Sequence, residues 1–161
     1  MDDFPNLKNP FHFLATLGGI GNIPFAPGTF GSIFSWLIFI FLSHFVNMFY
    51  VTFIGIFLSI WICEMASKNL IHKDHRSIVI DELIGIWIAL LPVLYLADTQ
   101  KERIVYAIAA LLFFRLFDIF KPFPVSYFDE NFKNGTGIVM DDLIAGAMAI
   151  IPSYIILTLL V

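Results

Sequence analysis

The sequence predicts an all-α fold, a multi-pass helical membrane bundle, and three observations support this. Apolar residues make up 59% of the 161 residues and charged residues 14%, whereas a typical soluble domain is about 45–50% apolar and about 25% charged. The apolar residues gather in stretches that approach the length of a membrane span. Charged residues gather between these stretches and at their ends. Such a chain needs lipid, or a very large interface, to cover its apolar surface.

Five stretches approach the roughly 20 residues that a spanning helix requires; they are 30–46, 49–66, 78–97, 103–120 and 143–161. Residues 11–27 are also apolar, but glycines and prolines interrupt them. Irregular backbone at membrane depth is tolerated only against protein or a water-filled cavity. We therefore expect about five membrane helices after an N-terminal re-entrant or interfacial segment, all in one domain, 1–161.

Basic residues divide unequally between the two faces if successive helices alternate in direction. One face receives seven of them: Lys8, Lys68, Lys73, Arg76, Arg115, Lys121 and Lys133. The other face receives only Lys101 and Arg103. The positive-inside rule assigns the face with seven to the cytoplasm.

Composition also excludes several kinds of partner and site. The net charge is −4 and no Lys/Arg-rich run is present, which argues against a nucleic-acid partner. Cys63 is the only cysteine, so an intrachain disulfide and a cysteine metal cluster are both excluded. We therefore expect the lipid bilayer as the main surrounding of the chain.

Two segments match each other at an offset of 60 residues. Residues 78–92 read IVIDELIGIWIALLP and residues 138–152 read IVMDDLIAGAMAIIP, with seven of fifteen positions identical. If residues 49–97 and 103–161 are the two halves of an internal repeat, carboxylates from both halves would face one shared ion. A chance match between two apolar helices with acidic starts explains the similarity equally well.

Six acidic residues lie at predicted helix ends on the expected cytoplasmic face: Glu64, Asp81, Glu82, Asp118, Asp141 and Asp142. A charge at the centre of a membrane helix costs about 2.5–3.5 kcal/mol by insertion scales, and a position near the interface reduces that cost. Mg²⁺ prefers oxygen ligands and is usually bound by one or two carboxylates, waters and substrate phosphate. The cluster therefore predicts a metal site to which all six contribute, some of them indirectly.

Other roles for single members of this set remain open. Asp81 and Asp141 would each also suit a helix N-cap or first turn, where the helix dipole favours an acid. Glu64 would alternatively pair with Lys68 at a spacing of four residues, and both this ion pair and a metal role remain open for it.

Phosphate-binding groups are expected in two further segments. Arg115, Asp118 and Lys121 share one stripe of a helix, and near carboxylates the two basic residues would hold phosphate oxygens. An ion-pair ladder that anchors the helix end is the alternative. Gly28 and Thr29 lie in the segment PFAPGTFGS, where a helix N-terminus offers free amides to an anion; an ordinary turn is the alternative there.

Four motifs resemble the phosphatidylglycerophosphatase A family in order and character. They are GGIGNIPFAPGTFGS, KDHRSIVIDELIGIW, FRLFDIFKPFP and GTGIVMDDLIAG, spread over roughly residues 14–150. The resemblance implies a bacterial inner-membrane enzyme with its site facing the cytoplasm. It further implies that Mg²⁺ supports hydrolysis of phosphatidylglycerophosphate to phosphatidylglycerol and inorganic phosphate.

The expected catalytic set is Asp81, Arg115, Asp118, Lys121 and Asp141. One or two Mg²⁺ ions would bind the terminal phosphate and acidify a water. Basic side chains and amides near Thr29 would stabilise the phosphoryl oxygens. A divalent cation transporter or channel is the alternative, because acids in membrane helices and a broken apolar segment also mark ion pathways. Acids gathered at one face, rather than at the midplane, count against that alternative.

Overall fold

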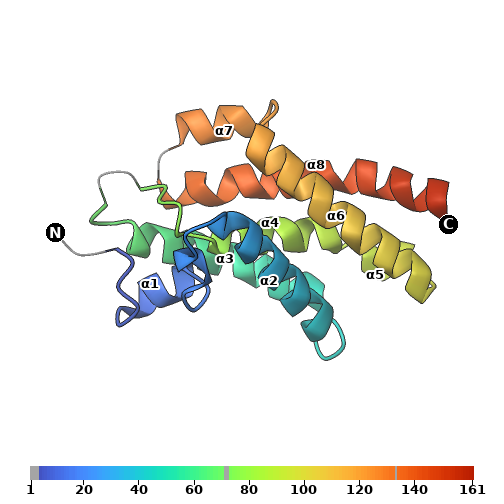
Figure 1. The fold of residues 1–161 in the computed structure, drawn as a ribbon, viewed down its shortest axis with the longest axis horizontal. Helices are drawn as coiled ribbons and strands as arrows, with labels where there is room; N and C mark the ends of the chain where they lie inside the picture. The colour runs from blue at the N-terminus through green and yellow to red at the C-terminus, as the bar shows by residue number, and fades with distance from the viewer. Residues whose placement is uncertain (1–3, 71–72, 133) are drawn as a thin grey trace.

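The computed structural model describes residues 4–70, 73–132 and 134–161, and the regular structure of these ranges is helical (Figure 1). This confirms the all-α prediction. Lys133, expected on the cytoplasmic face, lies outside the described ranges. The elements are α1 (Pro10–Ala15), the 3-10 turn η1 (Ile20–Asn22), α2 (Pro27–Leu42), α3 (Met48–Ala66), α4 (Ile80–Leu90), α5 (Val93–Leu96), α6 (Gln100–Phe120), α7 (Val125–Asn131) and α8 (Gly135–Leu160).

Helix α4 occupies the centre of the bundle. It packs against α2, α3, α6 and α8, and nine of its 11 residues are buried. Two side-chain hydrogen bonds connect α4 to its neighbours. The indole Nε1 of Trp87 donates to the Ser35 carbonyl of α2 at 2.9 Å, and the phenol Oη of Tyr106 in α6 donates to the Ala89 carbonyl at 3.2 Å. The buried apolar residues of α4 therefore contact protein rather than lipid.

Helices α4 and α8 meet at backbone contact through a pair of glycines. A Cβ atom added at Gly146 would lie 2.2 Å from the Gly85 carbonyl oxygen. Small residues allow helix backbones to approach this closely. Asp81 and Asp142 each precede one of these glycines by four residues, about one helical turn. The glycine contact therefore brings the acidic turns of α4 and α8 together.

The prediction of five membrane spans is not confirmed. Two helices of the described chain, α3 and α8, are long and apolar enough to cross a membrane, whereas α2 is apolar but has only 16 residues. The predicted span 78–97 divides into α4 and α5 at Pro92, because proline cannot continue the hydrogen-bond ladder of a helix. The predicted span 103–120 corresponds to α6, which carries charged residues near both ends.

Several predicted boundaries also move. Helix α8 begins at Gly135, not near residue 143, and the Asn134 side chain accepts the Gly137 amide at 2.9 Å as its N-cap. Asp141 therefore lies in the second turn and is no N-cap. Residues 125–131, predicted as part of a connection, form α7, which packs against α8. The two segments of the sequence repeat lie in α4 and α8, which pack against each other, and their duplication stays a prediction.

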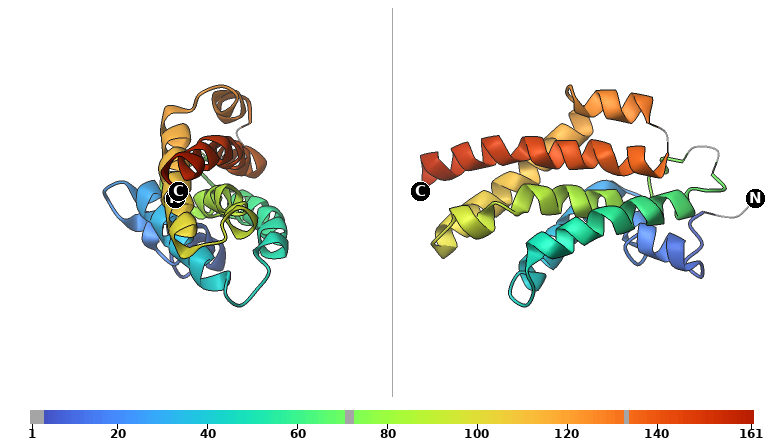
Figure 2. Two further views of the ribbon diagram at one scale, coloured as in Figure 1. Left: turned by 90° about the vertical axis from the view of Figure 1, so that its right-hand side faces the viewer. Right: turned by 180° about the vertical axis from the view of Figure 1, so that it is seen from behind.

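The two candidate spans approach each other at one end of the molecule. The end of α3 meets the start of α8, where the Glu64 carboxylate accepts the Gly135 amide at 2.6 Å. Helix α1 and the C-terminal end of α8 lie toward opposite ends of the molecule (Figures 1 and 2). Helix α7 packs alongside the N-terminal part of α8 (Figure 1 and the right view of Figure 2).

Candidate active site

A cavity of about 360 Å³ lies where the starts of α2, α4 and α8 meet the end of α6. Nine of the ten residues predicted from the sequence line it: Gly28, Thr29, Asp81, Glu82, Arg115, Asp118, Lys121, Asp141 and Asp142. The structure therefore brings together side chains that the sequence separates by up to 114 positions. Glu64, the tenth residue, does not line the cavity.

Glycines of α2 form the seat of the Glu82 carboxylate. A Cβ at Gly28 would lie 2.1 Å from Glu82 Oε1, and one at Gly31 would lie 2.5 Å from Glu82 Oε2. Any larger residue at these positions would push the carboxylate away. The glycines of the PFAPGTFGS segment thus make room for an acid of α4. The first-turn amides of Gly28 and Thr29 also have no partner within the helix, so they remain suited to an anion.

Arg115 of α6 connects three helices at the cavity wall. Its Nη1 lies 2.5 Å from Asp118 Oδ2, 3.3 Å from Glu82 Oε1 and 3.3 Å from Ser32 Oγ. The three charged side chains are 11–16% exposed, which limits screening by water. Arg115 Nε is buried and has no hydrogen-bond partner among the described residues. The guanidinium is held in place and retains a donor for a further acceptor.

Lys121 joins α6 to α7 and α8. Its Nζ donates to Asp129 Oδ1 at 2.6 Å and to Asp141 Oδ2 at 2.9 Å. Burial alone would lower the pKa of Lys121, but the hydrogen bonds to these two carboxylates outweigh it and raise the pKa above its ordinary value. Lys121 is therefore a fixed positive charge at neutral pH.

Two turns of the cavity wall hold non-glycine residues in the left-handed backbone region. Ala26 has φ 47° and Lys121 has φ 43°, and both line the cavity. An L-residue in this region costs about 1–2 kcal/mol, and such strain concentrates at functional sites. Both turns lie next to a helix end that contributes side chains to the cavity.

Three carboxylate oxygens at the cavity have no hydrogen-bond partner in the described part of the chain: Glu82 Oε2, Asp141 Oδ1 and Asp142 Oδ2, all buried. Leaving a buried acceptor unsatisfied costs roughly 1–3 kcal/mol, and more for a charged group. The cavity lining holds six acidic residues and only three basic ones. Both observations indicate that positive charge is needed here.

The donor chemistry of this lining fits a hard divalent cation, which takes carboxylate oxygens. Within the described ranges, no three Asp, Glu, His or Cys side chains stand close enough together to hold one ion as placed. Binding would thus require rotation of side chains that already lie in the cavity. The three unpartnered oxygens are the acceptors that remain available to an ion.

Glu64 has a different environment from the other predicted acids. Its Oε1 pairs with Lys73 Nζ at 2.9 Å, and its Oε2 accepts the amide of Gly135 at 2.6 Å. The predicted partner Lys68 is thus replaced by Lys73. Glu64 connects α3 to the start of α8 rather than facing the cavity.

Three further charged residues belong to the site and were not predicted. Asp74 and Arg76 line the cavity from the polar loop before α4. Asp129 holds Lys121 from α7, a helix that the sequence did not predict. The adjacency of KDHRS to the acidic start of α4 was the available signal for the first two.

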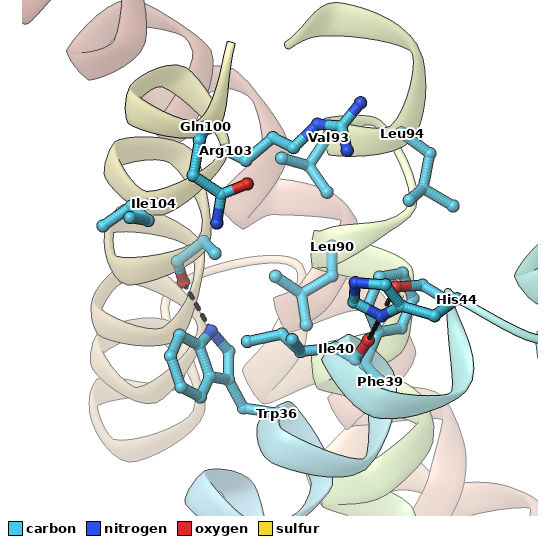
Figure 3. A pocket seen from close by; sticks show the side chains of 12 residues that line it. Trp36, Phe39, Ile40, His44, Leu90, Val93, Leu94, Gln100, Arg103 and Ile104 are labelled. Carbon is cyan, nitrogen blue, oxygen red and sulfur yellow. Dashed lines mark hydrogen bonds between the residues drawn. The ribbon is translucent and has the colours of Figure 1, made fainter. Parts of the chain in front are cut away.

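A second cavity, of about 190 Å³, lies at the opposite ends of α2, α4 and α6 (Figure 3). Trp36 Nε1 donates to the Ala107 carbonyl beside it at 2.9 Å, and His44 Nδ1 lies 2.7 Å from the Ile40 carbonyl. Arg103 reaches across from α6 toward Val93. The lining is mostly apolar and holds no carboxylate, so it lacks the groups that metal-assisted phosphate chemistry requires.

Comparison with known proteins identifies relatives over most of the chain. Residues 13–157 match the family model described as phosphatidylglycerophosphatase A. The phosphatidylglycerophosphatase A of Escherichia coli strain K12 is 36% identical over 146 residues, which cover 89% of this chain and 81% of the relative. That of Haemophilus influenzae is 37% identical over 154 residues, with 94% and 91% covered.

A Bacteroides thetaiotaomicron protein with the provisional name phosphatidylinositol-3-phosphatase is 35% identical over 155 residues, with 90% of this chain and 94% of the relative covered. No solved structure matches the chain. The names of these three relatives differ in the substrate, but each name describes a phosphatase of a phosphorylated phospholipid.

Proposed function

The chain belongs to the phosphatidylglycerophosphatase A family, and from this we propose that it is a phosphatase of phosphatidylglycerophosphate. The products are phosphatidylglycerol and inorganic phosphate. A water oxygen bonds to the phosphorus of the terminal phosphomonoester, the ester bond to the glycerol oxygen breaks, and that oxygen takes up a proton.

The observation that carries the proposal is the charge of the cavity. Six acidic and three basic side chains line it, so an anionic phosphate ester would meet a surplus of like charge. Bound divalent cations would offset this surplus of negative charge. We propose Mg²⁺, because the acidic side chains of the lining offer hard oxygen atoms as metal ligands. Glu82, Asp141 and Asp142 would hold the ion through their unpartnered oxygens, with Asp81 and Asp118 beside them. When bound, Mg²⁺ would polarise a phosphoryl oxygen and lower the pKa of a water.

The basic residues of the cavity position the phosphate. Arg115 offers its unpartnered Nε, and Lys121 offers a fixed positive charge. Together with the first-turn amides of Gly28 and Thr29, they would place donors around the phosphoryl oxygens where charge develops during displacement. The carboxylates that hold these cations, Asp118 and Asp129, keep them oriented.

The arrangement of the two candidate spans suits a lipid substrate. Because the end of α3 and the start of α8 meet beside the cavity, the cavity would lie near one face of the membrane. We propose the cytoplasmic face, where the basic residues are in excess. No observation supports the transporter alternative.

The proposal is tested by phosphate release from phosphatidylglycerophosphate in detergent micelles. We expect release that stops with EDTA and returns with added Mg²⁺. Asp142→Asn should remove the activity, whereas the matched carboxylate change Glu64→Gln, outside the cavity, should leave it largely intact. Release that persists in EDTA would contradict the metal assignment. Absence of release with Mg²⁺ present would contradict the proposed reaction.

The substrate range is tested with phosphatidylinositol 3-phosphate. This lipid also carries a phosphomonoester on a polyol that is joined to diacylglycerol by a phosphodiester. We expect a lower kcat/KM than for phosphatidylglycerophosphate. Equal or faster turnover would replace the proposed substrate with the phosphoinositide.

A further inference from the structure

Three highly exposed phenylalanines lie close in sequence to residues that line the cavity. Phe25, Phe120 and Phe123 are 79%, 76% and 78% exposed, the highest values among the exposed large hydrophobic residues of the described chain. Phe25 directly precedes Ala26, which lines the cavity, and the other two flank Lys121, which lines it as well. We call these three residues the phenylalanine rim.

The backbone turns at Ala26 and Lys121 lie between the phenylalanine rim and the charged side chains that line the cavity. Ala26 and Lys121 both adopt left-handed φ values, which non-glycine residues adopt only when the surroundings enforce it. The side chain of Lys121 is half-buried and bonds to Asp129 and Asp141. Phe120, directly before Lys121, and Phe123, two residues after it, are by contrast largely exposed. The charged group and the rings therefore occupy adjacent but different environments.

Further exposed apolar side chains lie on the adjoining turns of α2 and α6. Phe30 of α2 is 43% exposed, and Leu116 and Ile119 of α6 are 44% and 62% exposed. Ile119 also lines the cavity itself. An apolar surface of this kind around a polar site marks contact with a partner or a membrane. Since Arg115 and Lys121 lie directly inside it, the matching occupant has an anionic head and an apolar tail.

We propose that the phenylalanine rim inserts among lipid acyl chains and binds the diacylglycerol part of the substrate while the phosphate occupies the cavity. This inference rests on the proposed function and adds how the enzyme selects a membrane-anchored phosphate ester over a soluble one. The rim residues contact the tail of the substrate and not the reacting atoms, so they act as specificity determinants.

The test compares two substrates with the same head group, dioleoyl phosphatidylglycerophosphate in mixed micelles and its dihexanoyl analogue in free solution. The rim variant is Phe25→Ala/Phe120→Ala/Phe123→Ala of the full chain. We expect its kcat/KM to fall about tenfold or more for the dioleoyl lipid, because membrane binding scales with buried apolar area. Turnover of the dihexanoyl analogue should stay within about twofold.

The control removes three other exposed phenylalanines, none of which lines the cavity. In Phe41→Ala/Phe45→Ala/Phe57→Ala the original side chains are 64%, 71% and 60% exposed, and neither substrate should be affected. A rim variant that retains its preference for the dioleoyl lipid would overturn the proposal. Equal loss on both substrates would do the same. Wild-type protein that hydrolyses neither substrate would overturn the proposed function instead.

A spin label gives a readout that does not depend on activity. Cys63 is fully buried, so a label can be directed to Phe25→Cys or Phe123→Cys, with the exposed Asp98→Cys as the aqueous control. In phospholipid vesicles we expect labels at 25 and 123 to be accessible to oxygen and shielded from a water-soluble nickel chelate. The same accessibility at 25, 123 and 98 would contradict insertion.

Discussion

Replacing Gly28 by alanine tests whether this glycine serves the candidate active site or the folding of the protein. The new Cβ would lie 2.1 Å from Glu82 Oε1, 3.1 Å from Glu82 Cδ and 3.2 Å from Arg115 Nη2. Ordinary contacts of a Cβ begin at 3.4 Å, so Oε1 must retreat by roughly 1.3 Å, the difference between these distances. Misplacing a group at an active site by 1 Å costs about 10²-fold in rate. We therefore expect kcat/KM to fall about a hundredfold.

The stability of this variant should change little. The atom that must move belongs to a flexible side chain, and alanine is favoured over glycine within a helix by roughly 0.5–1 kcal/mol. Gly146→Ala is the matched comparison, because its Cβ would lie 2.2 Å from the backbone carbonyl oxygen of Gly85. There the helices must separate, and overpacking of this kind costs about 1–3 kcal/mol or more.

The assay pairs phosphate release with thermal unfolding followed by circular dichroism in the same detergent. We expect Gly28→Ala to lose activity at nearly unchanged Tm, and Gly146→Ala to lose Tm. A Gly28→Ala protein with wild-type turnover would refute the argument that Glu82 acts from the seat formed by α2. A large fall of its Tm would show that the glycine serves packing instead.

Three further predictions follow from the charged groups. Asp141→Asn should reduce turnover at saturating Mg²⁺ at least about 10²-fold, which is the effect of losing one group that stabilises developing charge. Wild-type turnover in this variant would exclude a catalytic role for Asp141. Lys121→Met should lower activity throughout pH 6–9, because the raised pKa of Lys121 keeps its side chain charged in the folded protein over this range. The stability that this charge contributes is likewise present at every pH below the unfolded-state pKa of about 10.4. A loss of activity confined to high pH would contradict the argument that Lys121 is charged throughout. Glu64→Gln should lower Tm while kcat stays within about twofold, because Glu64 holds Lys73 and Gly135; loss of kcat at unchanged Tm would place it in the catalytic machinery.

The convergence of these side chains at one cavity could be predicted because their chemistry constrains where they lie, whereas their catalytic roles stay a prediction. Acids such as Asp81 and Asp141 are costly within an apolar bundle, so acids at the ends of several apolar stretches indicated a shared polar site. The position of an acid within its helix did not, however, predict which way its side chain faces. Glu64 has the same position at a helix end as Asp118, yet it faces α8 and Lys73.

The membrane spans were predicted less well because hydropathy does not distinguish contact with lipid from contact with protein. Helix α4 is apolar because other helices surround it, and Pro92 ends it long before a spanning length. Helix α7 and the cavity-lining Asp74 and Arg76 come from segments of mixed polarity. Such segments give no periodic signal, and tertiary packing alone decides where their side chains lie.

The most direct measurement of the central claim is the binding of Mn²⁺, as a paramagnetic substitute for Mg²⁺, to the purified full-length protein in detergent, followed by electron paramagnetic resonance. Saturable binding should be present in the wild type and in Glu64→Gln, and it should be lost or weakened at least about tenfold when Asp141 and Asp142 are both replaced by asparagine. Unchanged Mn²⁺ affinity in that double variant would show that the carboxylates of α8 do not hold the ion.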